Sequence, residues 1–248
     1  MNNFLLEVCT DSVEASLTAF HAGADRLELC SSLIIGGTTP GVCLYKEVRK
    51  YCDMKIHVLI RPRFGDFCYT DYEFEVMKDE VRMFRGLGAD GIVIGALKPD
   101  GSLNLKQMEE FIHLADGVPV TLHRAFDVCA DPLRTLEEAG QIGIKTILTS
   151  GQKNKCIDGM DLIQELVSKS EGGIDILVGG GVNADVIQRI HSVTKAAAYH
   201  MSGKIIKESP MIYRKEEVSM GLPFLDEYQI VQADGNEIRR AVDRLQAL

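Results

Sequence analysis

The chain has 248 residues, of which 46% are hydrophobic, enough to bury the core of one domain of ordinary size. Its formal net charge of −9 argues against a broad nucleic-acid surface, although it leaves room for a local basic pocket that binds one small anion. No segment approaches the roughly 20 apolar residues of a membrane span, and the N-terminus does not resemble a secretion signal. We therefore expect a cytoplasmic protein forming one domain over residues 1–248, without nucleic-acid or membrane partners.

Short apolar runs alternate with amphipathic helical patterns along the chain. Strands are predicted at 4–9, 26–30, 56–61, 91–95, 118–123, 146–149, 174–178 and 197–202. Helices are predicted at 13–22, 42–51, 72–87, 105–116, 132–139, 160–168 and 184–191, with a terminal helix over 234–248 and an irregular segment over 203–225.

This alternation predicts an α/β fold, a single-domain TIM (β/α)8 barrel with parallel strands and an irregular C-terminal extension. A doubly wound open sheet is the alternative, but no GxGxxG motif follows the first predicted strand. The same absence, together with that of a Walker loop, leads us to predict no nucleotide cofactor. In a barrel, functional side chains gather at the carboxyl ends of the strands.

The first two predicted strands each end in a carboxylate and a thiol two residues apart. Glu7 and Cys9 share one strand face, as do Glu28 and Cys30, so both pairs are expected at one barrel mouth. Two thiolates in this arrangement suit Cu(I), which makes Cys9 and Cys30 candidate metal ligands. Alternatively, the cysteines only pack, while the glutamates orient a substrate or pair with arginines.

The third and fifth predicted strands end in basic and titratable groups. Arg61 and Arg63 flank a proline and could hold a carboxylate or phosphate, or Arg61 could pair with a mouth glutamate. His123 is followed by Arg124 and Asp127, and an imidazole in this position is a candidate for acid–base chemistry. It could equally form a hydrogen bond within the core.

The last three predicted strands end in small residues that suit an anion site. The candidates there are Ser150, Gly180, Gly181, Ser202 and Gly203. Glycine lets backbone N–H groups approach an anion, and many barrels bind phosphate after strands seven and eight. Tight turn geometry alone is the alternative explanation for the glycines.

With these motifs assembled, the chain resembles the CutC family. The stretches GADRLELC, GGTTPG, RPRFGDFCY, HRAFD, LTSGQ, GGGV and HMSG occur in the family's order, between residues 7 and about 213. The resemblance implies a cytoplasmic TIM barrel, commonly a homodimer or larger homo-oligomer, linked with copper tolerance and Cu(I) binding. One departure is Ile35 before Gly36 and Gly37, with Gly41 after Pro40, where family members often have EGG and TPS.

The resemblance also carries roles to individual residues. It places Glu7, Glu28, Arg61, Arg63, His123, Arg124 and Asp127 at the family's mouth and makes Cys9 and Cys30 the thiols relevant to copper. Our predicted function is copper homeostasis with Cu(I) as a candidate ligand. The alternative is an enzyme that uses acid–base chemistry on a small phosphorylated or carboxylated metabolite. In that case Glu7, Glu28, Arg61, His123 and Asp127 would be catalytic, and the arginines and the small residues after the last strands would bind the anion.

Overall fold

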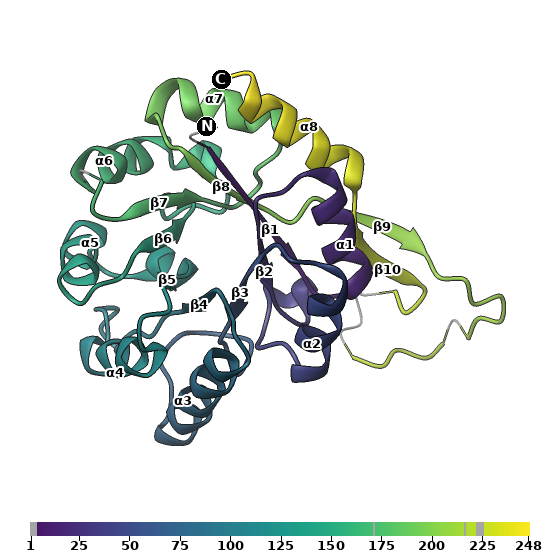
Figure 1. Cartoon of the computed structure of the whole chain (residues 1–248), viewed down its shortest axis with the longest axis horizontal. Coiled ribbons are helices and arrows are strands. Elements are labelled where there is room, and N and C mark those ends of the chain that lie inside the picture. Colours follow the sequence, from purple (N-terminus) through teal and green to yellow (C-terminus); the bar gives the residue numbers. More distant parts are fainter. Residues whose placement is uncertain (1–3, 171, 216, 222–225) are drawn as a thin grey trace.

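Eight parallel strands close into a barrel in order β1 to β8, with helices around the outside (Figure 1). The computed structural model describes residues 4–170, 172–215, 217–221 and 226–248. The barrel strands are β1 (Leu5–Thr10), β2 (Arg26–Leu29), β3 (Lys55–Leu59), β4 (Gly91–Ile94), β5 (Val120–Leu122), β6 (Thr146–Thr149), β7 (Asp175–Val178) and β8 (Ala198–Met201). The predicted TIM barrel is confirmed.

The helices follow the predicted alternation. They are α1 (Val13–Ala22), α2 (Val42–Tyr51), α3 (Asp71–Gly86), α4 (Leu105–Ala115), α5 (Pro132–Gln141), α6 (Met160–Ser170), α7 (Ala184–Thr194) and α8 (Gly235–Gln246). Short 3-10 helices, η1 (Leu33–Ile35), η2 (Arg124–Val128) and η3 (Cys156–Asp158), lie in the loops after β2, β5 and β6. Within the described residues, we find no helix with the length and apolar character that crossing a membrane requires.

Local sequence explains how an individual helix forms. In α3, the Thr70 side chain accepts a hydrogen bond from the N–H of Glu73, and the Glu73 carboxylate accepts one from the N–H of Thr70. Such a cap contributes about 1 kcal/mol because it satisfies N–H groups that the first turn leaves unpaired. Met77, Val81 and Phe84 then face the barrel at helical spacing and are buried.

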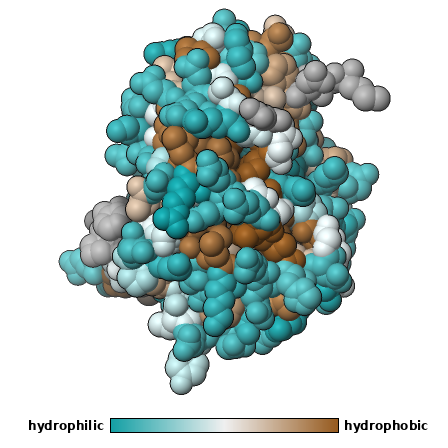
Figure 2. Space-filling view, turned by 90° about the vertical axis from the view of Figure 1, so that its left-hand side faces the viewer, coloured by the Kyte–Doolittle hydropathy of each residue, from teal (hydrophilic) through white to brown (hydrophobic). Residues whose placement is uncertain are grey.

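Most of the apolar core lies between the strands and the helices. Outward-facing strand residues such as Leu6, Val8, Ile56, Val58 and Ile92 are fully buried there. On the outer surface, the side of the molecule at the left of Figure 1 is largely hydrophilic, with hydrophobic side chains in bands between the polar ones (Figure 2). The alternate residues of these strands point into the barrel, and several of them are buried polar groups, among them Glu7, Glu28 and His57.

The segment after β8 is more regular than the sequence indicates. Strands β9 (Lys204–Glu208) and β10 (Gln229–Ala233) form an antiparallel hairpin where we expect an irregular segment over 203–225. Residues 216 and 222–225 of that prediction lie outside the described residues. The hairpin projects from the barrel beside α1 (Figure 1). The expected terminal helix is α8.

Candidate metal site at the barrel mouth

Barrel closure brings together polar residues of β1, β2 and β8. Glu7 lies in register with Arg26 of β2 on one side and with His200 of β8 on the other. Cys9 lies in register with Glu28. All of these side chains are largely removed from solvent, so their charges must be compensated within the barrel.

A chain of ionic contacts provides that compensation. The Nε of Arg26 lies 2.5 Å from Oε2 of Glu7, and Nδ1 of His200 lies 2.8 Å from Oε1. Burial alone would raise the pKa of Glu7, but Arg26 and His200 lower it to about 2. Burial opposes a charge on His200, yet Cys9, Glu28 and Glu7 hold its pKa well above the ordinary value. Glu7 is therefore ionised and fixes the orientation of the imidazole.

The other edge of His200 faces two further potential ligands. One ligand atom each from Cys9, Glu28 and His200 lies within 4.8 Å of the other two, and all three residues come from neighbouring strands. His200 Nε2 is 4.0 Å from Oε2 of Glu28, and the Cys9 thiol contacts the carbonyl of Met201 at 3.6 Å. Burial, with a contribution from Glu7, raises the pKa of Glu28 to about 7. This sulfur, oxygen and nitrogen group is the candidate metal site.

Cys30 has different surroundings from Cys9. It is fully buried in a small apolar cluster with Leu59 and Val93, and its thiol donates to the carbonyl of Thr10 at 3.5 Å. Burial raises the pKa of this thiol well above its usual value. Cys30 is not among the three residues of the compact ligand group, so its predicted role in Cu(I) binding stays a prediction.

Arg61 and His123 flank an aromatic ring at the mouth. Arg61 donates to the carbonyls of Gly37 and Gly65, at 3.1 and 2.8 Å, and not to a mouth glutamate as one interpretation of the sequence had it. Its guanidinium carbon lies 5.0 Å from the centre of the Phe67 ring, and the His123 ring lies 4.8 Å from the same centre. Among the described residues, Arg61 Nε and His123 Nε2 are buried atoms without a hydrogen-bond partner.

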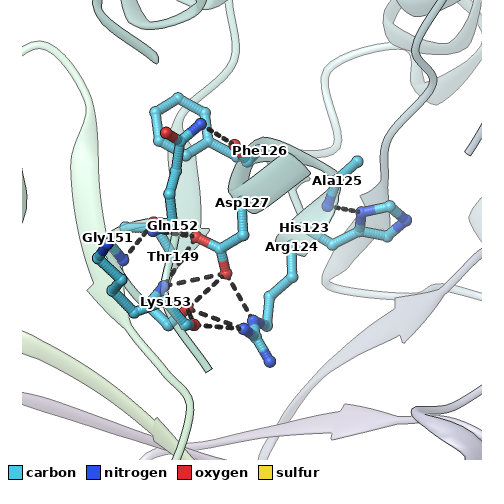
Figure 3. Close-up of polar contacts among 10 residues, drawn as sticks. His123, Arg124, Ala125, Phe126, Asp127, Thr149, Gly151, Gln152 and Lys153 are labelled. Carbon is cyan, nitrogen blue, oxygen red and sulfur yellow. Dashed lines mark hydrogen bonds and ion pairs between the residues drawn. The ribbon is translucent and has the colours of Figure 1, made fainter. Parts of the chain in front are cut away.

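The tautomer of His123 follows from its other nitrogen. Its Nδ1 accepts a hydrogen bond from the Ala125 N–H at 3.1 Å, visible at the right of Figure 3. Burial and the nearby Arg61 lower the pKa of His123 to about 3, so the ring is neutral near pH 7 and carries its proton on Nε2. These features favour a hydrogen-bond donor over the proton shuttle that the sequence suggested.

Asp127 organises the loop after β6 and is surrounded by donors (Figure 3). Its carboxylate accepts from Arg124 Nε at 2.6 Å, from the Thr149 hydroxyl at 2.6 Å and from the Ser150 N–H at 3.0 Å. Arg124 also donates to the Ser150 hydroxyl at 2.8 Å. Asp127 and Ser150 thus hold the η2 helix against this loop, and the predicted roles of Asp127 in catalysis and of Ser150 in anion binding stay predictions.

A cavity of about 460 Å³ occupies the mouth above these groups. Its lining includes Cys9, Glu28, Ile35, Arg61, Phe67, His123, Arg124, Asp127, Gly180, Gly181, His200 and Ser202. Ile35, which stands where CutC family members often have the glutamate of EGG, therefore adds an apolar side chain to the cavity wall. Arg63, by contrast, pairs with Glu73 and Asp66 at 2.5 and 3.0 Å and stabilises the loop after β3.

The predicted anion residues after β7 and β8 are only partly gathered at this cavity. Gly180, Gly181 and Ser202 line it, and both glycines have positive φ angles of 91° and 78°. Gly203 instead packs against α8, where a Cβ atom would come within 2.7 Å of Ile238. Across the described residues, we find no hydrogen bond donated by the backbone N–H groups of Gly180, Gly181 and Ser202.

Two members of the site, Arg26 and His200, are absent from the residues predicted from sequence. His200 had a signal, since it lies in the HMSG stretch at the end of a predicted strand. Its importance depends on β8 closing against β1, which places it beside Glu7. Arg26 begins β2 and is the register partner of Glu7 on β1, where its Nε forms the ion pair with the carboxylate.

The fold and site define a βα-barrel with a buried cysteine, glutamate and histidine group at its mouth. The sequence pattern of the CutC family matches residues 4–205, and the chain belongs to this family. It is 39% identical to the copper homeostasis protein cutC homolog of Mus musculus over 239 residues, which cover 96% of this chain and 88% of that one.

Further relatives agree in sequence and in structure. A CutC family protein of Bacteroides thetaiotaomicron is 40% identical, with 100% of this chain and 99% of the relative covered. The crystal structure of the putative copper homeostasis protein CutC from Streptococcus agalactiae superimposes with a TM-score of 0.77 at 30% identity, covering 80% of this chain and 98% of that one.

Proposed function

We propose that this CutC family protein acts in copper homeostasis by binding one Cu(I) ion through Cys9, His200 and Glu28. The observation that carries the proposal is the position of three ligand atoms within 4.8 Å of one another. Thiolate sulfur is a preferred ligand of Cu(I), and imidazole also binds copper. As part of this proposal we place the protein in the cytoplasm, where its seven free cysteines would stay reduced.

The contact between Glu7 and His200 supports a ligand role for this histidine. Metal-bound histidines commonly donate their second ring N–H to a carboxylate, which fixes the ring and increases its basicity. Glu7 occupies that position at 2.8 Å from Nδ1, and Arg26 holds Glu7 in turn. A carboxylate such as Glu28 is a harder ligand than Cu(I) prefers, so Zn²⁺ is the competing ion to test.

The test is an anaerobic titration of reduced protein with Cu(I), and separately with Zn²⁺, against a competing chelator. Cys9→Ser and His200→Gln are each expected to weaken Cu(I) binding by about tenfold or more, because each removes a ligand. Cys30→Ser should leave the affinity unchanged, and Cys43→Ser controls for a thiol exposed on α2. Unchanged affinity in the Cys9 and His200 variants, or a tighter Zn²⁺ site, contradicts the proposal.

A second candidate function, an enzyme acting on a small phosphorylated or carboxylated metabolite, rests on a different observation. Arg61 and His123 carry unpartnered nitrogens beside a cavity that would hold a small molecule. In such an enzyme, His123 would donate a hydrogen bond to the substrate. Glu28, with its pKa near 7, would be the acid–base group.

The N–H groups of Gly180, Gly181 and Ser202 would hold the anionic part of the substrate. This candidate is tested by thermal unfolding in the presence of sugar phosphates and of small carboxylates. A binding compound raises the melting temperature, and His123→Asn reduces the shift because it removes the Nε2 donor while offering an acceptor to Ala125. Cys43→Ser, which changes an exposed thiol on α2 outside the cavity, is the control and should keep the shift. The candidate fails when neither class binds, or when His123→Asn leaves binding intact.

A further inference from the structure

Arg61 carries a buried charge for which the barrel mouth offers no counter-charge. The residue is only 8% exposed, and its guanidinium donates hydrogen bonds to the carbonyls of Gly36, Gly37 and Gly65. In the described part of the chain Arg61 forms no ion pair, whereas the buried Arg26 pairs with a carboxylate at 2.5 Å. A buried cation without a counter-ion is costly, and an anionic ligand beside Arg61 would remove that cost.

Two N–H donors at this side of the cavity lack an acceptor. Nε of Arg61 and Nε2 of His123 are buried without a partner among the described residues, and both side chains line the cavity beside Phe67. His123 is 4% exposed, so water has little access to its ring. A carboxylate has two oxygens that accept from two N–H groups at once. It would therefore satisfy both donors and supply the missing negative charge.

A second group of free donors lies across the barrel. Strands β7 and β8 stand opposite β3 and β4 in the closed order, and the N–H groups of Gly180, Gly181 and Ser202 after them donate no hydrogen bond within the described residues. A Cβ on Gly180 would lie 2.9 Å from Cβ of Ser150, whose hydroxyl accepts from the Arg124 guanidinium. Helix α7 begins three residues after Gly181. Several N–H groups before a helix N-terminus, with a cation nearby, suit a phosphate group.

Much of the remaining cavity wall is apolar. It is formed by Leu33, Ile35, Leu59, Phe67, Leu148 and Val182. Such a wall favours a ligand with a hydrocarbon skeleton over a polyhydroxylated one, because hydroxyl groups would lose their hydrogen bonds to water there. The volume of about 460 Å³ leaves room for a chain of several carbon atoms between two charged ends.

We propose that the barrel mouth binds a phosphorylated carboxylic acid with a short, mainly apolar carbon chain. Its carboxylate binds Arg61 and His123, and its phosphate binds the N–H groups of Gly180, Gly181 and Ser202. This inference rests on the second candidate function, because it requires that the cavity binds a small metabolite. It narrows that candidate from phosphorylated or carboxylated compounds to compounds that carry both groups.

Matched ligands test the two ends separately. Phosphonoalkanoates of about three to six carbon atoms are titrated by calorimetry into the full-length, metal-free protein, together with the alkylphosphonate and the alkanoate of each length. At least one phosphonoalkanoate is expected to bind about tenfold or more tightly than either one-ended counterpart, because the second contact then forms within one molecule. This comparison uses wild type alone and does not depend on the folding of any variant.

A substitution assigns the carboxylate to its subsite. His123→Asn removes the Nε2 donor and keeps an acceptor for the Ala125 N–H. It should abolish the advantage of the phosphonoalkanoate over the alkylphosphonate and leave the affinity for the alkylphosphonate unchanged. His113→Asn changes an exposed histidine on α4 and is the matched control, which should keep the advantage. The melting temperature verifies that both variants keep their fold.

The outcomes distinguish this inference from the candidate function on which it rests. Equal affinities for a phosphonoalkanoate and its alkylphosphonate or alkanoate counterpart at every length would overturn the two-ended ligand and leave a one-ended metabolite standing. An advantage that survives in His123→Asn would also overturn the inference, because the carboxylate then binds elsewhere. If none of the three series binds, the inference and the candidate function both fail.

Discussion

Replacing His123 with asparagine should remove a specific part of the pH dependence of stability. The pKa of this imidazole in the folded protein is about 3, lowered by burial and by Arg61 from an ordinary value of 6.5. Below pH 6.5 the unfolded chain therefore takes up a proton that the folded chain does not. The free energy of unfolding is unaffected by this group above pH 6.5 and falls as the pH drops toward 3.

The magnitude follows from the separation of the two pKa values. One pKa unit corresponds to about 1.4 kcal/mol, so between pH 7 and pH 5 the buried imidazole lowers the free energy of unfolding by about 2 kcal/mol. Asparagine cannot be protonated, and its side-chain oxygen offers an acceptor near the position of Nδ1 for the Ala125 N–H.

Urea unfolding at the two pH values measures the effect, followed by circular dichroism because the chain has no tryptophan. The loss of stability between pH 7 and pH 5 should be smaller in His123→Asn than in wild type by about 2 kcal/mol. The substitution itself also changes the free energy of unfolding, but by the same amount at both pH values, so this contribution cancels when the two losses are compared. Equal losses in the two proteins would refute a buried, neutral His123.

Two further predictions concern the barrel interior. Arg26→Met should lower the free energy of unfolding at pH 7 by about 3 to 5 kcal/mol, because it leaves the Glu7 carboxylate buried without its cation, and adding Glu7→Gln should recover part of the loss. Gly91→Ala should cost about 1 to 3 kcal/mol, because its Cβ would lie 2.5 Å from the His57 ring. Gly86→Ala is the matched control on α3, where a Cβ meets nothing within 4 Å, and should raise stability by up to about 1 kcal/mol. Urea unfolding checks all three, and similar effects at positions 91 and 86 would contradict the packing described for the interior.

The barrel was predictable because its strands and helices differ strongly in local pattern. Apolar runs such as 146–149 and 174–178 are short and bounded by glycine or polar residues, while the intervening segments carry helical spacing and capping side chains. The hairpin gave no comparable signal. Its strands are short, mix charged with apolar residues, and pair across a connection of 20 residues, 209–228, far longer than the two to five residues typical of a hairpin.

The site was predictable in its location but not in its contacts. The positions of Glu7, Cys9 and Glu28 follow from strand periodicity alone, since they lie inside regular strands. The contact with His200 depends on barrel closure between segments more than 190 residues apart, which no local pattern encodes. The orientation of Arg63 could not be predicted from strand periodicity. Because β3 ends at Leu59, Arg63 lies in the loop after the strand, where side chains no longer alternate with a period of two residues.

Copper K-edge X-ray absorption of the reduced protein loaded with one equivalent of Cu(I) tests the proposed metal site most directly. Ligation by Cys9, His200 and Glu28 predicts one sulfur neighbour together with nitrogen or oxygen neighbours, and loss of the sulfur signal in Cys9→Ser. Two sulfur neighbours in wild type, reduced to one by Cys30→Ser, would contradict the account and identify the paired thiols as the copper site.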